Sequence, residues 1–171
     1  INALFQQRVK FLIAGKMALN IIKTSLEPLY DNFRGFDHFN ETYELYCHTV
    51  EAKWQYAQYR PYKKEVLKEP RRIYIHYYFN IDKAAEEEKV FDRKLMRLRQ
   101  ELESGNPVLL HEREYEKYFD VKTTPKRGTK VAVKEDVVLL AKKYFGFFAL
   151  MTNETMDAQT ALETYRNKDL V

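Results

Sequence analysis

A basic turn near residue 126 is the first feature whose residue types could do chemistry. Its four cations are Lys122, Lys126, Arg127 and Lys130. No acidic residue lies among them, and the central Thr-Pro-Lys-Arg-Gly run favours a tight reversal of the chain. Cations grouped in this way can bind the phosphates of a nucleic-acid backbone. The alternative is a solvated loop without a ligand.

A second basic stretch, at residues 60–72, combines cations with aromatic residues. Pro61 and Pro70 indicate a charged connector, and Glu65 and Glu69 dilute its positive charge. The cations are Arg60, Lys63, Lys64, Lys68, Arg71 and Arg72, with Tyr59 and Tyr62 alongside. This connector can also lie along a phosphate backbone. Here too, the alternative is a solvated loop.

Histidine and cysteine offer little for catalysis or metal binding. The four histidines, His38, His48, His76 and His111, show no metal-ligand spacing. His76 falls in a strand-like run, where we expect a packed residue. Cys47 precedes His48 directly, and neighbouring residues of a strand point to opposite faces, which argues against a cysteine–histidine nucleophile. The sequence also contains no glycine-rich phosphate loop and no Gly-x-Ser-x-Gly nucleophile motif.

Composition limits the class of protein. The chain has 171 residues, enough for one sizeable core or two small ones, and a net charge of +4 that permits binding to a polyanion. Its 13 tyrosines and 11 phenylalanines favour a β-rich core, with base stacking as the alternative. The single cysteine excludes an internal disulfide and suits a reducing cytosol, so we expect a cytoplasmic protein. No apolar run is long enough to cross a bilayer, and we expect no membrane partner.

The periodicity of the ends predicts strands next to helices. Residues 1–10 have the pattern of a helix end, and 11–15 form a short apolar strand. Helical spacing returns from residue 16 to 30 and is disturbed near Pro28. A second apolar strand covers 144–151, and Asp157 is placed to cap a final helix.

The middle of the chain predicts further strands and one long helix. Residues 42–59 form one or two strands, and 71–80 form the clearest strand of the chain. A helix should run from about 83 to 104 and end at Gly105. Its apolar seam is Phe91, Leu95, Leu98 and Leu102. This seam packs on a sheet or, alternatively, forms a homodimer contact as a short coiled coil.

Shorter elements complete an α+β fold. Two strands, at 118–122 and 130–133, should flank the basic turn, and 134–144 has the pattern of a short helix. We therefore predict a mixture of strands and helices, β-rich in the middle, with one long helix.

The last thirty residues resemble the end of the catalytic domain of DDE-type bacterial insertion-sequence transposases. Residues 146–153 read Gly-x-Phe-x-Leu-x-Thr-Asn, as in the strand that precedes the family's signature helix. That helix carries Tyr-x2-Arg-x3-Glu-x6-Lys, in which Tyr165 matches the tyrosine and Lys168 stands where arginine is usual. The family's catalytic glutamate would follow one residue after Val171. The resemblance implies ribonuclease-H-like edges at 1–30 and 143–171, with an insertion region at 31–142.

The resemblance also implies a chemistry. Such transposases hold two divalent metals with three carboxylates and transfer phosphoryl groups during DNA transposition, a DNA recombination reaction. We expect Mg²⁺ in the full-length protein and no cofactor, metal ligand or catalytic residue in this chain, which would be an inactive fragment. Tyr165 and Lys168 would contact phosphates of the transposon end, with Arg166 as a helper. Alternatively, Tyr165 packs in the core beside Ala161 and Leu162, and the cations are solvated.

Two other functional classes remain open from the sequence. One is a non-catalytic nucleic-acid-binding module that uses the basic turns and tyrosines. The other is a protein-interaction module built around the helix at 83–104. Both can hold within a transposase fragment.

Overall fold

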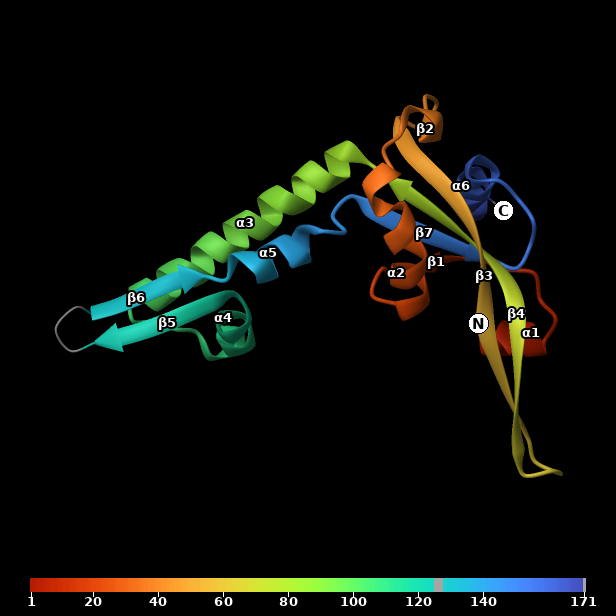
Figure 1. Ribbon diagram of the computed structural model, residues 1–171, viewed down its shortest axis with the longest axis horizontal. Helices are drawn as coiled ribbons and strands as arrows, with labels where there is room; N and C mark the ends of the chain where they lie inside the picture. Colours follow the sequence, from red (N-terminus) through yellow and green to blue (C-terminus); the bar gives the residue numbers. More distant parts are fainter. Residues whose placement is uncertain (125–127, 171) are drawn as a thin grey trace. The chain divides into compact units, whose positions relative to one another are not determined.

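The chain folds as two compact units, which the computed structural model describes over residues 1–124 and 128–170, with side chains through residue 168 (Figure 1). The first unit comprises Ile1–Ile81 together with the chain from Phe147 onward, and the second comprises Asp82–Gly146. Both contain helices and strands, so the predicted α+β class is confirmed. The predicted division at 1–30, 31–142 and 143–171 refers to parts of a longer transposase and stays a prediction.

A five-stranded antiparallel sheet forms the centre of the first unit, in the order β1-β7-β4-β3-β2. Its strands are β1 (Leu12–Gly15), β2 (Phe39–Asn40), β3 (Leu45–Arg60), β4 (Glu65–Phe79) and β7 (Phe147–Thr152). The strands predicted at 11–15, 71–80 and 144–151 are confirmed, and residues 45–60 form one strand. The two sequence-distant ends meet because β1 pairs with β7 from Leu12↔Thr152 to Gly15↔Ala149.

Helices cover both faces of this sheet. Ile22 and Leu26 of α2 (Asn20–Leu26) are buried on one face, and Tyr77 donates a hydrogen bond of 2.7 Å from its hydroxyl to the Ile22 carbonyl. On the other face lies α6 (Ala158–Arg166), where the Tyr78 hydroxyl donates to the Ala158 carbonyl at 2.7 Å. Because both faces are covered, the end of β4 is apolar or aromatic at almost every position.

Shorter segments complete the first unit. Helix α1 (Asn2–Gln6) precedes β1, and two 3-10 turns, η1 (Glu27–Asn32) and η2 (Phe36–His38), follow α2. The predicted helix at 16–30 is therefore shorter than expected. It changes to 3-10 geometry at Glu27, where Pro28 stands in the first turn of η1 and removes a backbone donor. A further 3-10 turn, η4 (Asn167–Leu170), follows α6.

The predicted connector at 60–72 is wrong. Strands β3 and β4 pair continuously from Tyr46↔Phe79 to Arg60↔Glu65, and only residues 61–64 form the turn. Pro70 is tolerated because it pairs with Gln55 in a part of β4 that has no second neighbour, since β7 pairs only with Tyr74–Phe79. A missing N–H on such a free edge breaks no ladder hydrogen bond.

The second unit packs one long helix against a two-stranded ribbon. Its elements are α3 (Ile81–Glu103), η3 (Leu109–His111), α4 (Glu112–Tyr118), β5 (Phe119–Thr124), β6 (Gly128–Val133) and α5 (Glu135–Lys142). Gly105 follows α3 with a φ of 72°, which favours glycine at a helix end. The predicted long helix and the two strands around the basic turn are confirmed.

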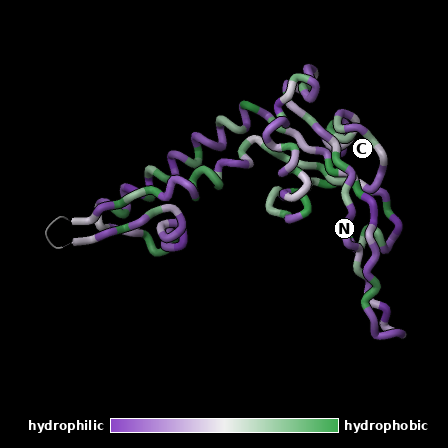
Figure 2. Tube along the Cα trace, viewed as in Figure 1, coloured by the Kyte–Doolittle hydropathy of each residue, from purple (hydrophilic) through white to green (hydrophobic). Residues whose placement is uncertain are grey.

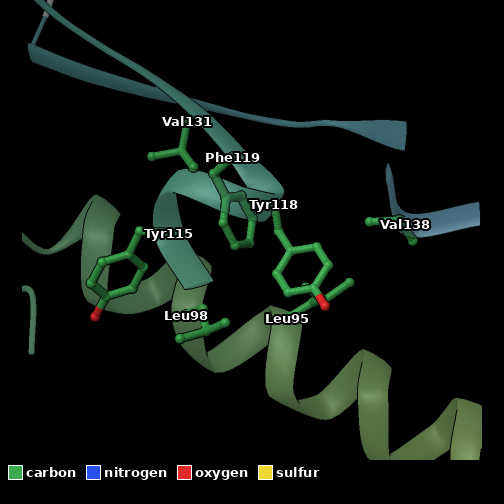
Figure 3. Packing of buried hydrophobic residues seen from close by; sticks show 7 residues of the cluster. All are labelled: Leu95, Leu98, Tyr115, Tyr118, Phe119, Val131 and Val138. Atoms are coloured by element: carbon green, nitrogen blue, oxygen red, sulfur yellow. The ribbon is translucent and has the colours of Figure 1, made fainter. Parts of the chain in front are cut away.

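The core of the second unit uses the apolar seam of α3 (Figure 3). Leu95 and Leu98 pack against aromatic and aliphatic residues of the same unit, and Phe91 and Leu102 are partly buried beside them. The partners are Tyr115, Tyr118, Phe119, Val131 and Val138. The seam is therefore covered within the unit, as the sheet-packing interpretation predicted. A homodimer, which stays a prediction, would need other residues for its contact.

Candidate nucleic-acid interface

The residues that the transposase resemblance singles out lie at the C-terminal end of α6 and in the 3-10 turn η4 that follows it. The helix begins at a cap, since the Asp157 carboxylate accepts hydrogen bonds from the Thr160 backbone N–H and from the Thr160 hydroxyl, both at 2.8 Å. These bonds lower the pKa of Asp157. The predicted N-cap role of Asp157 is confirmed, and the cap sets the rotation of every later side chain on the helix.

Tyr165 belongs to the buried stripe of α6. Ala158, Ala161 and Leu162 are buried, and Tyr165 is half-buried against the same cluster one turn later. This spacing places the four residues on one helix face. The packing that the sequence offered as an alternative for Tyr165 is therefore present. Among the described residues its hydroxyl has no hydrogen-bond partner, so it remains able to donate to a ligand.

Two cations lie over tyrosine rings beside this stripe. The Lys168 Nζ is 4.2 Å from the centroid of the Tyr165 ring, and the Arg166 Cζ is 4.6 Å from that of Tyr43. Both cations are exposed, and neither forms an ion pair with a described residue. Cation–π contacts of this kind orient a cation and leave its outer side free for an anion.

Tyr43 is a neighbour that sequence reasoning missed. It precedes β3, far from Arg166 in the chain, and partial burial together with Glu163 raises its pKa. No signal in the sequence connects Tyr43 to Arg166. Only the packing of α6 on the sheet brings the two residues together.

Two lysines lie opposite each other on the basic β5–β6 ribbon of the second unit. In the β5–β6 register, Lys122 is the direct partner of Lys130, so both side chains leave the same face of the ribbon. Like charges placed opposite each other are unfavourable without an anion between them. Neither lysine forms an ion pair with a described residue. Lys126 and Arg127, the other two predicted ligands of this turn, lie outside the described residues.

A hollow lies between this ribbon and α3. Its lining residues are Arg99, Glu103, Lys122, Thr124, Gly128, Thr129, Lys130 and Val131. Arg99 donates to the Glu103 carboxylate at 2.8 Å, which leaves the two lysines as the uncompensated charges of the hollow. Sequence reasoning missed Arg99, because a basic residue on the polar side of a helix carries no sign of the ribbon it will meet. The hollow can accept a phosphate group.

His76, His48, His38 and Cys47 make packing contacts within the first unit. His76 is fully buried, its Nδ1 lies 2.9 Å from the Thr49 hydroxyl, and its Nε2 has no partner among the described residues. Burial lowers the pKa of His76 to about 4. Cys47 lies on the α6 side of the sheet, whereas His48 lies on the other side next to His38, with ring centroids 4.7 Å apart. The predicted opposite orientation of Cys47 and His48 is confirmed.

No group of three or more His, Cys, Asp or Glu side chains that could hold a metal ion occurs within residues 1–124 and 128–168. Likewise, no helix in the described part of the chain is long and apolar enough to span a membrane.

The predicted DNA ligands thus form two separate groups. Tyr165, Arg166 and Lys168 belong to the first unit, and Lys122 and Lys130 belong to the second. Comparison with known proteins adds no further assignment, because the sequence matches no protein-family model, no curated protein and no solved structure.

Proposed function

We propose that this chain is part of a bacterial DDE-type insertion-sequence transposase and that it binds the DNA of the transposon end. In the full-length protein, three carboxylates outside this chain would hold Mg²⁺, and the bound ions would supply the chemistry of phosphoryl transfer. The chain described above supplies contacts to the phosphate backbone. Such a protein acts on the bacterial chromosome in the cytoplasm, where Cys47 stays reduced.

The observation that carries the proposal is the succession of strand, capped helix and cation-bearing helix end at β7 and α6. The residues that match the family's motif occur at the end of a helix whose start is set by Asp157. The Tyr165 hydroxyl has no hydrogen-bond partner within the described part of the chain, and Lys168 lies over its ring. A phosphate that must be positioned and partly neutralised suits a tyrosine hydroxyl whose own ring has a lysine ammonium 4.2 Å from its centroid.

The spacing of the motif supports the same role. Tyr165, Lys168 and the residue that would follow Val171 are separated by three and four positions. Here α6 ends at Arg166 and Lys168 lies in the 3-10 turn η4, whereas in a continuous α-helix these positions would share one face. A glutamate there would lie next to the two phosphate contacts, as the proposed metal-ion chemistry requires. Lysine in place of the family's arginine keeps the charge but lacks a bidentate fork, so one phosphate contact is expected from Lys168.

The second unit supports DNA binding through its ribbon. The opposed pair Lys122 and Lys130 is costly in the free protein and becomes favourable when a phosphate lies between the two ammonium groups. The pair therefore functions as a backbone contact without base specificity.

The first test is the parental reading frame. The proposal expects a glutamate directly after Val171, a basic residue seven positions further on, and two strand-borne aspartates upstream of Ile1. A reading frame that lacks the glutamate contradicts the transposase assignment.

The second test uses the full-length protein with labelled duplexes copied from the DNA that flanks the reading frame. Lys168→Gln should reduce the log–log salt slope of binding by about 0.9, the value for one phosphate contact. Tyr165→Phe removes only the hydroxyl and should slow Mg²⁺-dependent cleavage of the flanking duplex while the fold stays intact. The control Lys23→Gln changes one exposed lysine on α2 and should alter neither property. Equal salt slopes for Lys168→Gln and the control would refute the phosphate contact.

A further inference from the structure

The hairpin of β3 and β4 extends beyond the five-stranded sheet as a two-stranded arm. We call residues 53–72 the β3–β4 arm, whose pairs run from Lys53↔Arg72 to Arg60↔Glu65 (Figure 1). Strand β7 pairs with β4 only from Tyr74 to Phe79, and β2 pairs with β3 only at Leu45 and Tyr46. Both outer edges of the arm are therefore without a strand neighbour among the described residues.

The net positive charge of the chain is concentrated in the arm. It contains seven Lys or Arg residues and two Glu residues, a net charge of +5. The whole chain has a net charge of +4, so the other 151 residues together sum to −1. Figure 2 shows hydrophilic residues at the end of the arm, at the bottom of the view. A concentration of charge in one projecting element creates a local attraction for polyanions that the chain as a whole lacks.

The strand register separates paired from unpaired charge. Both glutamates share one face of the arm with two arginines, and the ion pairs are Arg60–Glu65 at 3.7 Å and Arg71–Glu69 at 2.9 Å. The opposite face is formed by Lys53, Gln55, Ala57, Tyr59, Val66, Lys68, Pro70 and Arg72. It contains three cations and no acid, and we call it the cationic face. Its three cations form no ion pair with a described residue.

The cationic face has a pair of directly opposed cations, as the β5–β6 ribbon of the second unit does. Lys53 is the direct partner of Arg72, so two like charges oppose each other across the ribbon. The first acid on this face is Glu51, which lies beyond the arm and opposite Tyr74. The Arg72 guanidinium lies over the Tyr74 ring, with its Cζ 5.5 Å from the ring centroid.

The root of the arm is anchored, whereas its end is open. Tyr56 is buried, its ring centroid lies 6.1 Å from that of Phe5, and the Arg71 Cζ lies 5.5 Å from the same centroid. The Trp54 indole donates to the Asn2 side chain at 2.8 Å. Beyond this root, Tyr59 and Val66 oppose each other and are more than half exposed, and Tyr62 at the turn is fully exposed. A two-stranded hairpin is barely stable by itself in water, so an exposed aromatic end indicates an element that is completed by a ligand.

We propose that the β3–β4 arm enters the major groove of double-stranded DNA with its cationic face toward the phosphates. The major groove of B-form DNA is about 12 Å wide and admits a two-stranded ribbon. Eight residues per strand extend over about 26 Å, which follows the groove through much of one helical turn. The deep, narrow major groove of A-form RNA excludes a ribbon, so duplex DNA is the expected ligand. This inference rests on the proposed function, because it names a second element that holds the same DNA.

The test compares two triple variants of the 171-residue chain. The arm variant is Lys53→Gln, Lys68→Gln and Arg72→Gln. The matched control is Lys23→Gln, Lys89→Gln and Lys117→Gln, which removes the same charge from exposed positions outside the arm. Binding to a fluorescein-labelled 30-base-pair DNA duplex of mixed sequence is measured between 50 and 200 mM NaCl, and circular dichroism verifies that each variant folds. Duplex RNA of the same sequence and poly-L-glutamate serve as comparison ligands.

The arm variant should lower the log–log salt slope by about 2.7 if each cation meets one phosphate, whereas the control should keep the wild-type slope. Wild-type protein should bind the DNA duplex more tightly than the RNA duplex. A slope change below about 0.9 for the arm variant, with wild-type binding intact, overturns the role of the arm and leaves the proposed function standing. Equal affinity of the wild-type protein for the RNA and DNA duplexes overturns the groove assignment. An arm variant that loses binding to poly-L-glutamate but not to the DNA duplex overturns it as well. Absence of any wild-type binding to DNA overturns the proposed function together with this inference.

Discussion

Acidification from pH 7 to pH 5 should destabilise the first unit through one residue, His76. This imidazole is fully buried, has only the Thr49 hydroxyl at its Nδ1, and leaves Nε2 without a partner among the described residues. Burial lowers the pKa of His76 from 6.5 to about 4, and the more distant Asp157 carboxylate opposes this shift only in part. In the unfolded chain the imidazole regains its ordinary pKa.

The sign and size of the effect follow from this difference. Because the folded pKa is the lower one, the unfolded chain binds the proton first, and stability falls as the pH drops from 6.5 toward 4. A shift of about 2.5 units corresponds to about 3.4 kcal/mol when the titration is complete. At pH 5 about 2 kcal/mol of this is already lost, whereas at pH 7 the loss is negligible.

Urea unfolding at pH 7 and pH 5 measures this loss. Trp54, the single tryptophan, lies in the first unit, so its fluorescence reports on the unfolding of that unit. His76→Gln keeps an amide that can bond to Thr49 and removes the titration. The wild type should lose about 2 kcal/mol more than the variant between the two pH values.

Comparison of the two proteins removes other titrating groups from the result. Burial and His38 also lower the pKa of His48, but this residue is present in both proteins and cancels. The pKa of Asp157 is lowered, so its contribution is lost only below the ordinary range of an aspartate, outside the pH window. If wild type and His76→Gln lose equal stability, the burial argument for His76 is refuted.

Three further substitutions test the packing that positions the candidate interface. Asp157→Ala removes the cap of α6 and should cost about 1 kcal/mol, measured by urea unfolding, and Asp157→Asn should recover most of this loss. Tyr78→Phe removes the buried hydrogen bond to the Ala158 carbonyl, which keeps its helical bond, and should cost about 0.5–1.5 kcal/mol in the same measurement; an unchanged stability would show that the bond is dispensable. Leu98→Ala opens the core of the second unit and should cost about 2–5 kcal/mol, detected as faster hydrogen exchange of amides in α3, whereas the exposed Met96→Ala should leave exchange unchanged.

Local patterns in the sequence were sufficient for several elements of the fold. Helix α3 has a regular apolar seam and ends at Gly105, whose positive φ reflects the usual geometry of a helix end. Strands β5 and β6 flank a turn whose residue types favour reversal, and Asp157 caps α6 as its position indicates. These features depend on residues a few positions apart, so their physics is contained in the sequence nearby.

The extent of the β3–β4 hairpin could not be predicted in the same way. Pro61 and Pro70 indicate an interruption, and only the pairing of the strands shows that one lies in the turn and the other on a free edge. Whether a proline breaks a strand depends on which side of it a neighbour lies. That neighbour, β7, is about 70 residues further along the chain, as the register of the sheet shows.

The sequence by itself determined that cations gather at residues 122–130, at 60–72 and near the C-terminal end, because charge and spacing are properties of the chain. The tertiary structure decided which of these cations remain unpaired. The register of β3 and β4 joins Arg60 to Glu65 and Arg71 to Glu69, and it leaves Lys68 on a face without acids. Likewise, only the packing of α6 places Arg166 over Tyr43. The reason is physical: an ion pair needs two groups within a few ångströms, and that proximity is created by strand register and helix packing rather than by order along the chain.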